Sequence, residues 1–257
     1  MKFHVGVGVI LSLWAVPAYA DSCDYEEPRT ATLDAAGLER VVVRARAGSL
    51  SIVGKSGLGE VRVEGIACAG KRDHLESVRL VTERTGSTAT IEVEIPDTDW
   101  SMFSGTSPRL DLEVDVPHGV ALEVKDSSGA MEIRGVGSAD VQDSSGEIVI
   151  EDVSGDLRID DSSGSIEVSD VSGDVRLEDS SGGIEVRRVG GSVVVDRDSS
   201  GSIEVEKVQQ NVLVRRDSSG SISVADVGGD FTVERDSSGS IHYEDVEGRV
   251  DIPENKR

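Results

Sequence analysis

The chain is 257 residues long and carries 49 acidic against 26 basic side chains, which gives a net charge of −23 at pH 7. Such a negative surface repels the phosphates of nucleic acids and of anionic lipid headgroups, so neither is expected as a partner. Aromatic residues make up only 3% of the sequence, which disfavours a groove that stacks sugar rings on aromatic side chains.

Residues 1–20 are typical of a secretory signal peptide. Lys2 supplies a positive start, residues 5–16 are apolar, and Ala18-Tyr19-Ala20 has the small-x-small pattern that precedes a cleavage site. The apolar run is shorter than the roughly 20 residues that a membrane span needs. Asp21 and Ser22 before Cys23 disfavour a lipid anchor. The sequence therefore predicts an exported chain without a membrane span, either periplasmic or secreted to the cell surface.

Residues 21–120 are strand-like but irregular. Apolar and polar residues alternate in five segments, at 40–47, 49–53, 60–66, 88–95 and 110–116. We interpret this part as irregular first coils with a cap over the open end of a solenoid; a separate N-terminal β-domain is the alternative. Two cysteines, Cys23 and Cys68, in an exported chain predict one disulfide.

Residues 121–257 are dominated by the tetrapeptide Asp-Ser-Ser-Gly. Its copies recur at nearly constant intervals and begin at Asp126, Asp143, Asp161, Asp179, Asp198, Asp217 and Asp236. Each repeat holds two stretches with alternating apolar residues, each followed by a turn. The chain is therefore predicted to be all-β, a parallel β-solenoid with two short strands per 18–19-residue coil. Pro253 and the charged tail after it are expected to close the C-terminal end.

Like residues should stack inside the solenoid in ladders, because matching positions recur once per coil. Three predicted ladders are Ile166, Ile184, Ile203, Ile222 and Ile241; Val168, Val186, Val205, Val224 and Tyr243; and Val175, Val193, Val212, Phe231 and Val250.

The two turns of each coil differ in one position. One turn carries a valine that should point inward, and the other carries a serine, which predicts a buried serine column with hydrogen bonds to neighbouring coils. These serines are Ser144, Ser162, Ser180, Ser199, Ser218 and Ser237. Later coils carry one extra residue, Arg197, Arg216 or Arg235, which predicts an arginine column that compensates the aspartates beside it.

The repeats resemble a known family. Strands of the form Ser-Gly-x-Ile/Val-x-Val, alternating with Val-x-Gly-Asp-Val-x-Val, are similar to those of the bacterial putative-adhesin domain family, of the domain of unknown function 4097 type. Residues 110–119, followed by Leu122-Glu123-Val124-Lys125, resemble the stretch that leads into its repeats. The resemblance spans roughly residues 40–252. It implies an envelope or surface role and brings no catalytic residues with it.

The acidic turns raise the hypothesis of a metal site. Ca²⁺ takes roughly six to eight oxygen ligands from carboxylates, carbonyls and water, and stacked turns offer such atoms. The candidate ligands are Asp143, Asp160, Asp161, Glu178 and Asp179. The competing interpretation is that each aspartate accepts hydrogen bonds from the amides of its own turn. The known calcium-binding nonapeptide places its glycines and aspartate differently, which favours the turn interpretation.

For function, the sequence favours a non-enzymatic exported scaffold that binds a protein or a cell-surface glycan along the solenoid, with no cofactor. A calcium- or polysaccharide-binding module that uses the acidic columns is the alternative, and a polysaccharide-active β-helix enzyme comes third. The histidines of the predicted mature chain, His74, His118 and His242, are scattered, so a structural role is expected for each.

Overall fold

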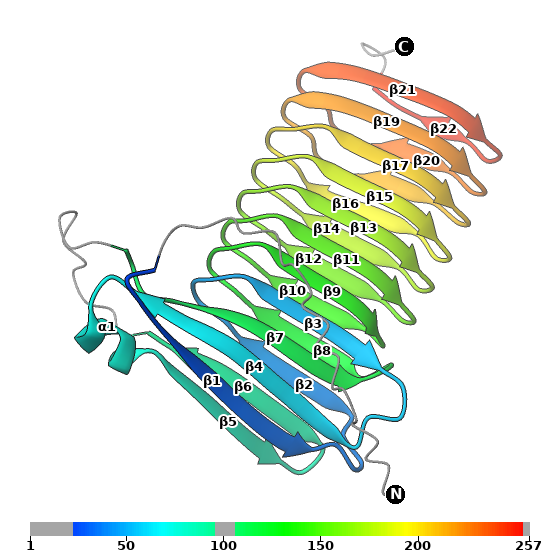
Figure 1. Ribbon diagram of the computed structural model, residues 1–257. Coiled ribbons are helices and arrows are strands. Elements are labelled where there is room, and N and C mark those ends of the chain that lie inside the picture. Colours follow the sequence, from blue (N-terminus) through cyan, green and yellow to red (C-terminus); the bar gives the residue numbers. More distant parts are fainter. Residues whose placement is uncertain (1–22, 96–105, 254–257) are drawn as a thin grey trace, which may run out of the picture.

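The computed structural model describes residues 23–95 and 106–253 (Figure 1). The predicted signal peptide at 1–20 and the charged tail after Pro253 lie outside the described residues. Elements of the N-terminal part are β1 (Tyr25–Asp34), β2 (Arg40–Arg44), β3 (Leu50–Lys55), β4 (Glu60–Ala69), α1 (Arg72–Ser77), β5 (Arg79–Thr85), β6 (Thr88–Glu94) and β7 (Arg109–Pro117).

The repeat region follows with one pair of strands per coil. Its strands are β8 (Ala121–Lys125), β9 (Met131–Val136), β10 (Ala139–Gln142), β11 (Ile148–Val153), β12 (Leu157–Asp160), β13 (Ile166–Val171), β14 (Val175–Glu178), β15 (Ile184–Val189), β16 (Val193–Arg197), β17 (Ile203–Val208), β18 (Val212–Val214), β19 (Gly220–Val227), β20 (Phe231–Val233), β21 (Gly239–Val246) and β22 (Val250–Asp251).

Two sheets of eleven strands face each other along the whole rod. Sheet A has the order β1-β4-β7-β3-β9-β11-β13-β15-β17-β19-β21, and sheet B has the order β22-β20-β18-β16-β14-β12-β10-β8-β2-β6-β5. Within the repeats every pairing is parallel, so each coil adds one strand to each sheet (Figure 1). The prediction of a parallel β-solenoid is confirmed.

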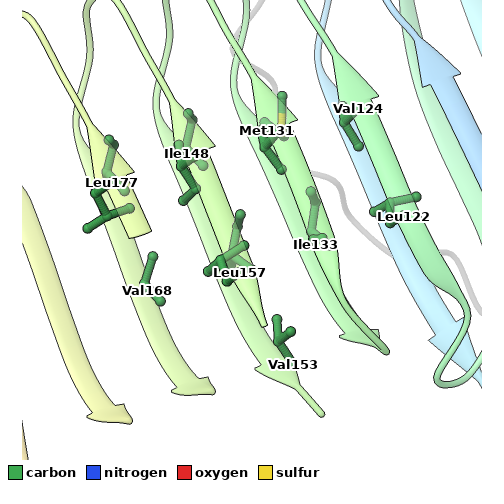
Figure 2. Packing of buried hydrophobic residues seen from close by; sticks show 14 of the residues in the cluster. Leu122, Val124, Met131, Ile133, Ile148, Val153, Leu157, Val168 and Leu177 are labelled. Carbon is green, nitrogen blue, oxygen red and sulfur yellow. The ribbon is translucent and has the colours of Figure 1, made fainter. Parts of the chain in front are cut away.

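The interior is a stack of branched aliphatic side chains. The predicted ladders beginning at Ile166, Val168 and Val175 are buried through most of their length, and Figure 2 shows the same stacking in the earlier coils. Each fully buried side chain of this kind stabilises the fold by about 1.5–3 kcal/mol. The ladders end at β21 and β22, the last strands of the described residues, where Tyr243 is 49% exposed and Val250 is half-buried.

The coil of β13 and β14 explains why the two turns differ. In β14 the side chains alternate without interruption, so Val175, Leu177 and then Asp179 point inward. In β13 the alternation is broken at Asp170, which has a φ of 58° in the left-handed region, and Val171 returns to the interior. The inward position of the second turn therefore belongs to the aspartate.

The predicted buried serine column is therefore wrong. The first serine of each tetrapeptide, such as Ser162 or Ser180, is exposed or half-buried. Coils are instead joined by the second serine: the hydroxyl of Ser181 donates to the carbonyl of Ser162 at 3.4 Å, and Ser219 donates to Ser199 at 3.1 Å. The column of inward valines from Val153 to Val227 is confirmed.

The extra residue of the later coils forms a bulge in sheet B. Leu177 pairs with Val195 but Glu178 pairs with Arg197, so Asp196 is the residue left over. The inward residues keep their register, because the insertion is absorbed outside the core. Arg197 forms an ion pair with Glu178 of the preceding coil. The prediction that the arginine column compensates the adjacent aspartates is thus wrong for Arg197, which contacts an outward glutamate.

The N-terminal part continues both sheets and then turns antiparallel. β2 pairs in parallel with β8, and β3 with β9, whereas the outer pairs β1–β4, β4–β7 and β5–β6 are antiparallel. The short helix α1 lies against β1 and β4. Sequence patterning does not predict this helix, because six residues with one buried side chain, Leu75, show no helical period.

A disulfide joins Cys23 to Cys68, with the two Cα atoms 5.6 Å apart. It fixes the start of β1 to the end of β4, where Glu26 and Cys68 are register partners. This is the pairing expected from the even cysteine count. Within the described ranges, no helix has the length and apolar character required to cross a bilayer.

Candidate functional site

Seven aspartates form a file inside the solenoid, which we call the inner aspartate column. They occupy the turns that follow the sheet B strands β8, β10, β12, β14, β16, β18 and β20. The backbones of Asp198 and Asp217, and of Asp217 and Asp236, form parallel β-bridges between successive coils. Together with Ser169 the seven aspartates make up the buried polar and charged residues of the described chain. The members are Asp126, Asp143, Asp161, Asp179, Asp198, Asp217 and Asp236.

In several members of the column, one carboxyl oxygen accepts hydrogen bonds from backbone N–H groups of the turn in which the aspartate lies. Oδ1 of Asp179 accepts hydrogen bonds from the backbone N–H groups of Ser180 at 2.6 Å and Ser181 at 3.1 Å. Oδ1 of Asp161 accepts one from Ser162 at 2.7 Å. These bonds satisfy amides that the sheet ladder leaves free, which is ordinary chemistry for aspartate in a turn.

The other oxygen is buried without such a bond. Oδ2 of Asp161, Asp179 and Asp198 is inaccessible to solvent and has no hydrogen-bond partner among the described residues. The side chains of Asp179 and Asp198 are 0% exposed. A buried carboxylate oxygen without a donor is costly, so these atoms require an explanation.

Burial also disfavours the charged form of these groups. Loss of solvation raises the pKa of Asp126 to about 7 and the pKa of Asp161 and Asp198 to about 6; hydrogen bonds from turn amides lower it in part. The negative charges of neighbouring column members raise it further. The pKa of Asp143 and Asp179 is raised by burial in the same way.

The five predicted calcium ligands do not form one cluster. Asp143, Asp161 and Asp179 belong to the interior column, whereas Asp160 and Glu178 are cross-strand partners on sheet B that point away from the core. Within residues 23–95 and 106–253, no three carboxylate, imidazole or thiol groups converge in a way that could hold a metal ion. The calcium site stays a prediction, and the bonds at Asp161 and Asp179 match the competing turn interpretation.

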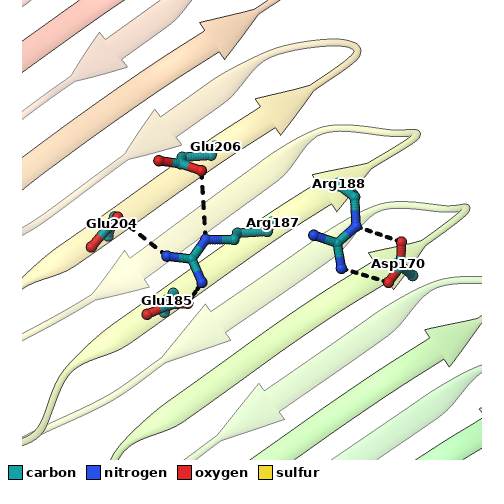
Figure 3. Close-up of polar contacts among 6 residues, drawn as sticks. All are labelled: Asp170, Glu185, Arg187, Arg188, Glu204 and Glu206. Atoms are coloured by element: carbon teal, nitrogen blue, oxygen red, sulfur yellow. Dashed lines mark hydrogen bonds and ion pairs between the residues drawn. The ribbon is translucent and has the colours of Figure 1, made fainter.

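The outer face of sheet A carries charged side chains that pair along the rod. Arg187 lies among three glutamates, Glu185 of its own strand and Glu204 and Glu206 of the next coil; its Nη2 is 3.4 Å from Glu204, and its Nε is 3.5 Å from Glu206 (Figure 3). Earlier in the sheet, Arg134 forms ion pairs with Glu132 of the same strand and with Glu151 of the next coil. The face is thus an internally paired surface.

The outer face of sheet B holds an open groove of about 490 Å³ across β8, β10, β12 and β14. Arg40 pairs with Glu123 at 3.7 Å, and Arg176 pairs with Asp196 at 2.5 Å. Arg158 forms no ion pair with any residue that the structure describes. The charged lining is Arg40, Glu123, Asp140, Asp156, Arg158, Asp174 and Arg176.

Sequence reasoning missed this groove. Its lining comes from several different coils, and the only signal was that Asp140, Arg158 and Arg176 recur at matching outward strand positions of successive coils.

Solved structures with similar arrangement share little sequence with this chain. A putative cell adhesion protein from Clostridium sporogenes is 12% identical, with 89% of this chain and 99% of that chain covered and a TM-score of 0.41. A putative lipid binding protein from Parabacteroides distasonis is 17% identical, with 87% and 96% covered and a TM-score of 0.41. A putative adhesin from Parabacteroides merdae is 11% identical, with 90% and 97% covered and a TM-score of 0.39.

No curated protein matches the chain. A family model described as Toastrack DUF4097 matches residues 64–252, well over half of the sequence. The match begins within β4 and runs through all of the regular coils.

Proposed function

The chain belongs to the Toastrack DUF4097 family, and on that basis we propose that it is a non-enzymatic scaffold of the cell envelope or exterior, which holds a protein or cell-surface glycan along its outer faces. The observation that supports this best is the repetition of charged side chains in outward positions. Such positions recur once per coil, about 4.8 Å apart, on both sheets. Repetition of this kind builds extended binding surfaces in repeat proteins.

The groove on sheet B is the part of this surface best suited to a partner. It combines Arg158, which lacks an ion-pair partner among the described residues, with the acidic side chains of Asp140, Asp156 and Asp174. A stable interface buries about 800 Å² on each side, more than the groove alone offers. The contact would therefore extend over neighbouring coils, which fits an elongated partner.

Export is supported by the disulfide. Disulfides persist in oxidising compartments and are rare in the cytosol, and Cys23 lies just after the predicted signal peptide. Both features support a mature chain that resides in the envelope or outside the cell.

Localisation and capture test the proposal together. Tagged chain is followed by cell fractionation, and partners are crosslinked and captured from envelope extracts with wild type, Arg158→Glu in the groove and Arg134→Glu on the opposite sheet. We expect a specific partner that Arg158→Glu loses and Arg134→Glu retains. Cytoplasmic location, or identical capture by both variants, would contradict the proposed surface. Turnover of acidic polysaccharides by the purified chain would favour an enzyme instead.

A further inference from the structure

We propose that the inner aspartate column is a proton-binding site, in which the protonated carboxyl group of one coil donates a hydrogen bond to the ionised carboxylate of the next. This assigns a ligand, the proton, to buried oxygens that the scaffold role does not use. It is independent of which partner binds the outer faces.

The column places carboxyl groups close to one another inside the tube. The carboxyl groups recur once per coil inside the tube, so neighbours lie about 5 Å apart and would repel strongly if all were ionised. The buried residues of the described chain include seven aspartates but no arginine, lysine or histidine. The negative charge therefore has no cation inside the core to balance it.

Some buried Oδ2 atoms of the column have no hydrogen-bond donor in the part of the chain that the structure describes. Oδ1 of Asp179 is satisfied by its turn, but Oδ2 of Asp161, Asp179 and Asp198 lacks a donor among the described residues. A carboxylate can only accept hydrogen bonds, whereas a protonated carboxyl group also donates one. One proton shared between two neighbouring coils supplies a donor and removes one unit of charge.

Charged groups around the column do not replace that proton. On the sheet B side, the residues just before the aspartates point outward; the charged ones are Lys125, Asp160, Glu178, Arg197, Arg216 and Arg235. Of these, Arg197 is already paired with Glu178. On the sheet A side, the ionisable residues that follow the turns are also outside the core; they are Glu132, Glu147, Glu167, Glu185, Glu204 and His242. None of these groups brings a donor into the interior.

A metal ion fits less well than a proton. Ca²⁺ needs roughly six to eight oxygens, and within the described ranges no metal-binding group of three or more ligands occurs. A proton needs only two facing carboxyl oxygens.

Carbon-13 NMR of the full mature chain, labelled at the aspartate carboxyl carbons, tests the site in the folded protein between pH 3 and pH 9. We expect several aspartate signals to titrate at about pH 6 or above, and Asp161→Asn and Asp198→Asn to remove signals from this group. Asp170→Asn, on the outer surface of the same solenoid, should remove a signal that titrates in the acidic range. If every aspartate is ionised below about pH 5 in the folded chain, the proposal is wrong.

Two further measurements separate protons from metal and from misfolding. Native mass spectrometry should find no bound metal ion, and millimolar Ca²⁺ should leave the melting temperature of the wild type unchanged; a bound ion would overturn the proposal. Asparagine keeps the Oδ1 acceptor and the volume of aspartate, so the variants are expected to fold. If they do not, the wild-type titration alone decides: signals that titrate at about pH 6 or above sustain the site.

Discussion

Arg188 and Asp170 form a two-pronged ion pair between successive coils, with Nε to Oδ1 and Nη2 to Oδ2 both at 2.7 Å (Figure 3). Both residues have a φ of 58°, in the left-handed region that a non-glycine residue seldom adopts. The hydrogen bond from Arg188 holds the pKa of the Asp170 carboxyl below its usual value. The pair thus joins two strained turns on the outside of the rod.

Replacement of Asp170 by asparagine should lower the free energy of unfolding at low salt by a small amount. Both side chains are about half exposed, so the effect should shrink in 1 M NaCl. Because the folded pKa of Asp170 is lowered, its contribution is present above about pH 4 and is lost as the pH falls below that. Urea unfolding at two salt concentrations measures this. Asp226→Asn, at the same turn position in a later coil, is the control and should show a smaller salt-dependent change.

The inner aspartate column predicts that the wild type loses stability as the pH rises. Burial raises the pKa of Asp126 to about 7 and that of Asp161 and Asp198 to about 6, whereas an unfolded aspartate titrates near about 3.9. Between these values the folded chain binds more protons than the unfolded chain. This contribution to stability is therefore complete below about pH 4 and lost as the pH rises through about 6 to 7.

Urea unfolding at pH 5 and pH 8 checks this window, which excludes the acidic titration of Asp170. The unfolding free energy should fall by an amount on the order of a few kcal/mol, since each pKa unit corresponds to about 1.4 kcal/mol. The urea m-value should stay constant, because the surface exposed on unfolding is the same. Equal stability at both pH values would show that the column does not titrate in this range.

The glycines of the tetrapeptides should resist substitution. Gly182 has a φ of 141°, and a Cβ there would overlap the carbonyl oxygen of Gly164 in the coil below. Gly182→Ala should lower the unfolding free energy by about 2–3 kcal/mol, through backbone strain and displacement of the neighbouring coil. Its neighbour Gly183 has space for a Cβ, so Gly183→Ala should change stability by less than about 0.5 kcal/mol. Thermal and urea unfolding of the two variants provide the comparison.

The disulfide should stabilise the N-terminal end. Cys23 and Cys68 are 45 residues apart in sequence, and closure of such a loop contributes about 4 kcal/mol in the chain-entropy model. In the double variant Cys23→Ser/Cys68→Ser, amide exchange should quicken most in β1, which is tethered through this bond. Exchange in β13 to β19 should stay as in the wild type, because each coil contacts mainly its neighbours. A uniform increase along the chain would contradict this local role.

The sequence predicts the solenoid well because the constant spacing of the repeats determines which residues stack on one another in successive coils. Recurrence once per coil places Ile166 over Ile184 and Val168 over Val186, and the structure pairs these residues in register. The prediction of the second turn failed because both halves of the coil look alike as sequence. Only the left-handed residue at Asp170 distinguishes them, and an aspartate in that conformation leaves no sequence signal that separates it from Asp179.

The N-terminal part and the sites were harder to predict. β1, β5 and α1 lie outside the repeats, so no stacking rule assigns their partners, and β1 pairs with β4 although β2 and β3 lie between them in the chain. The metal hypothesis treated Asp160 and Asp161 as neighbours in one site. Adjacent residues of an extended chain point to opposite sides of the sheet, so one is outside and the other inside.

The bulge at Asp196 has a consequence for how the protein can change in length. Coils with and without the surplus residue stack on one another without disturbing the interior, since that residue is accommodated outside. Unequal recombination between two gene segments that encode Asp-Ser-Ser-Gly would delete or add whole coils and still leave every remaining strand opposite a suitable neighbour. A single recombination event of this kind would thus change the length of the solenoid by whole coils.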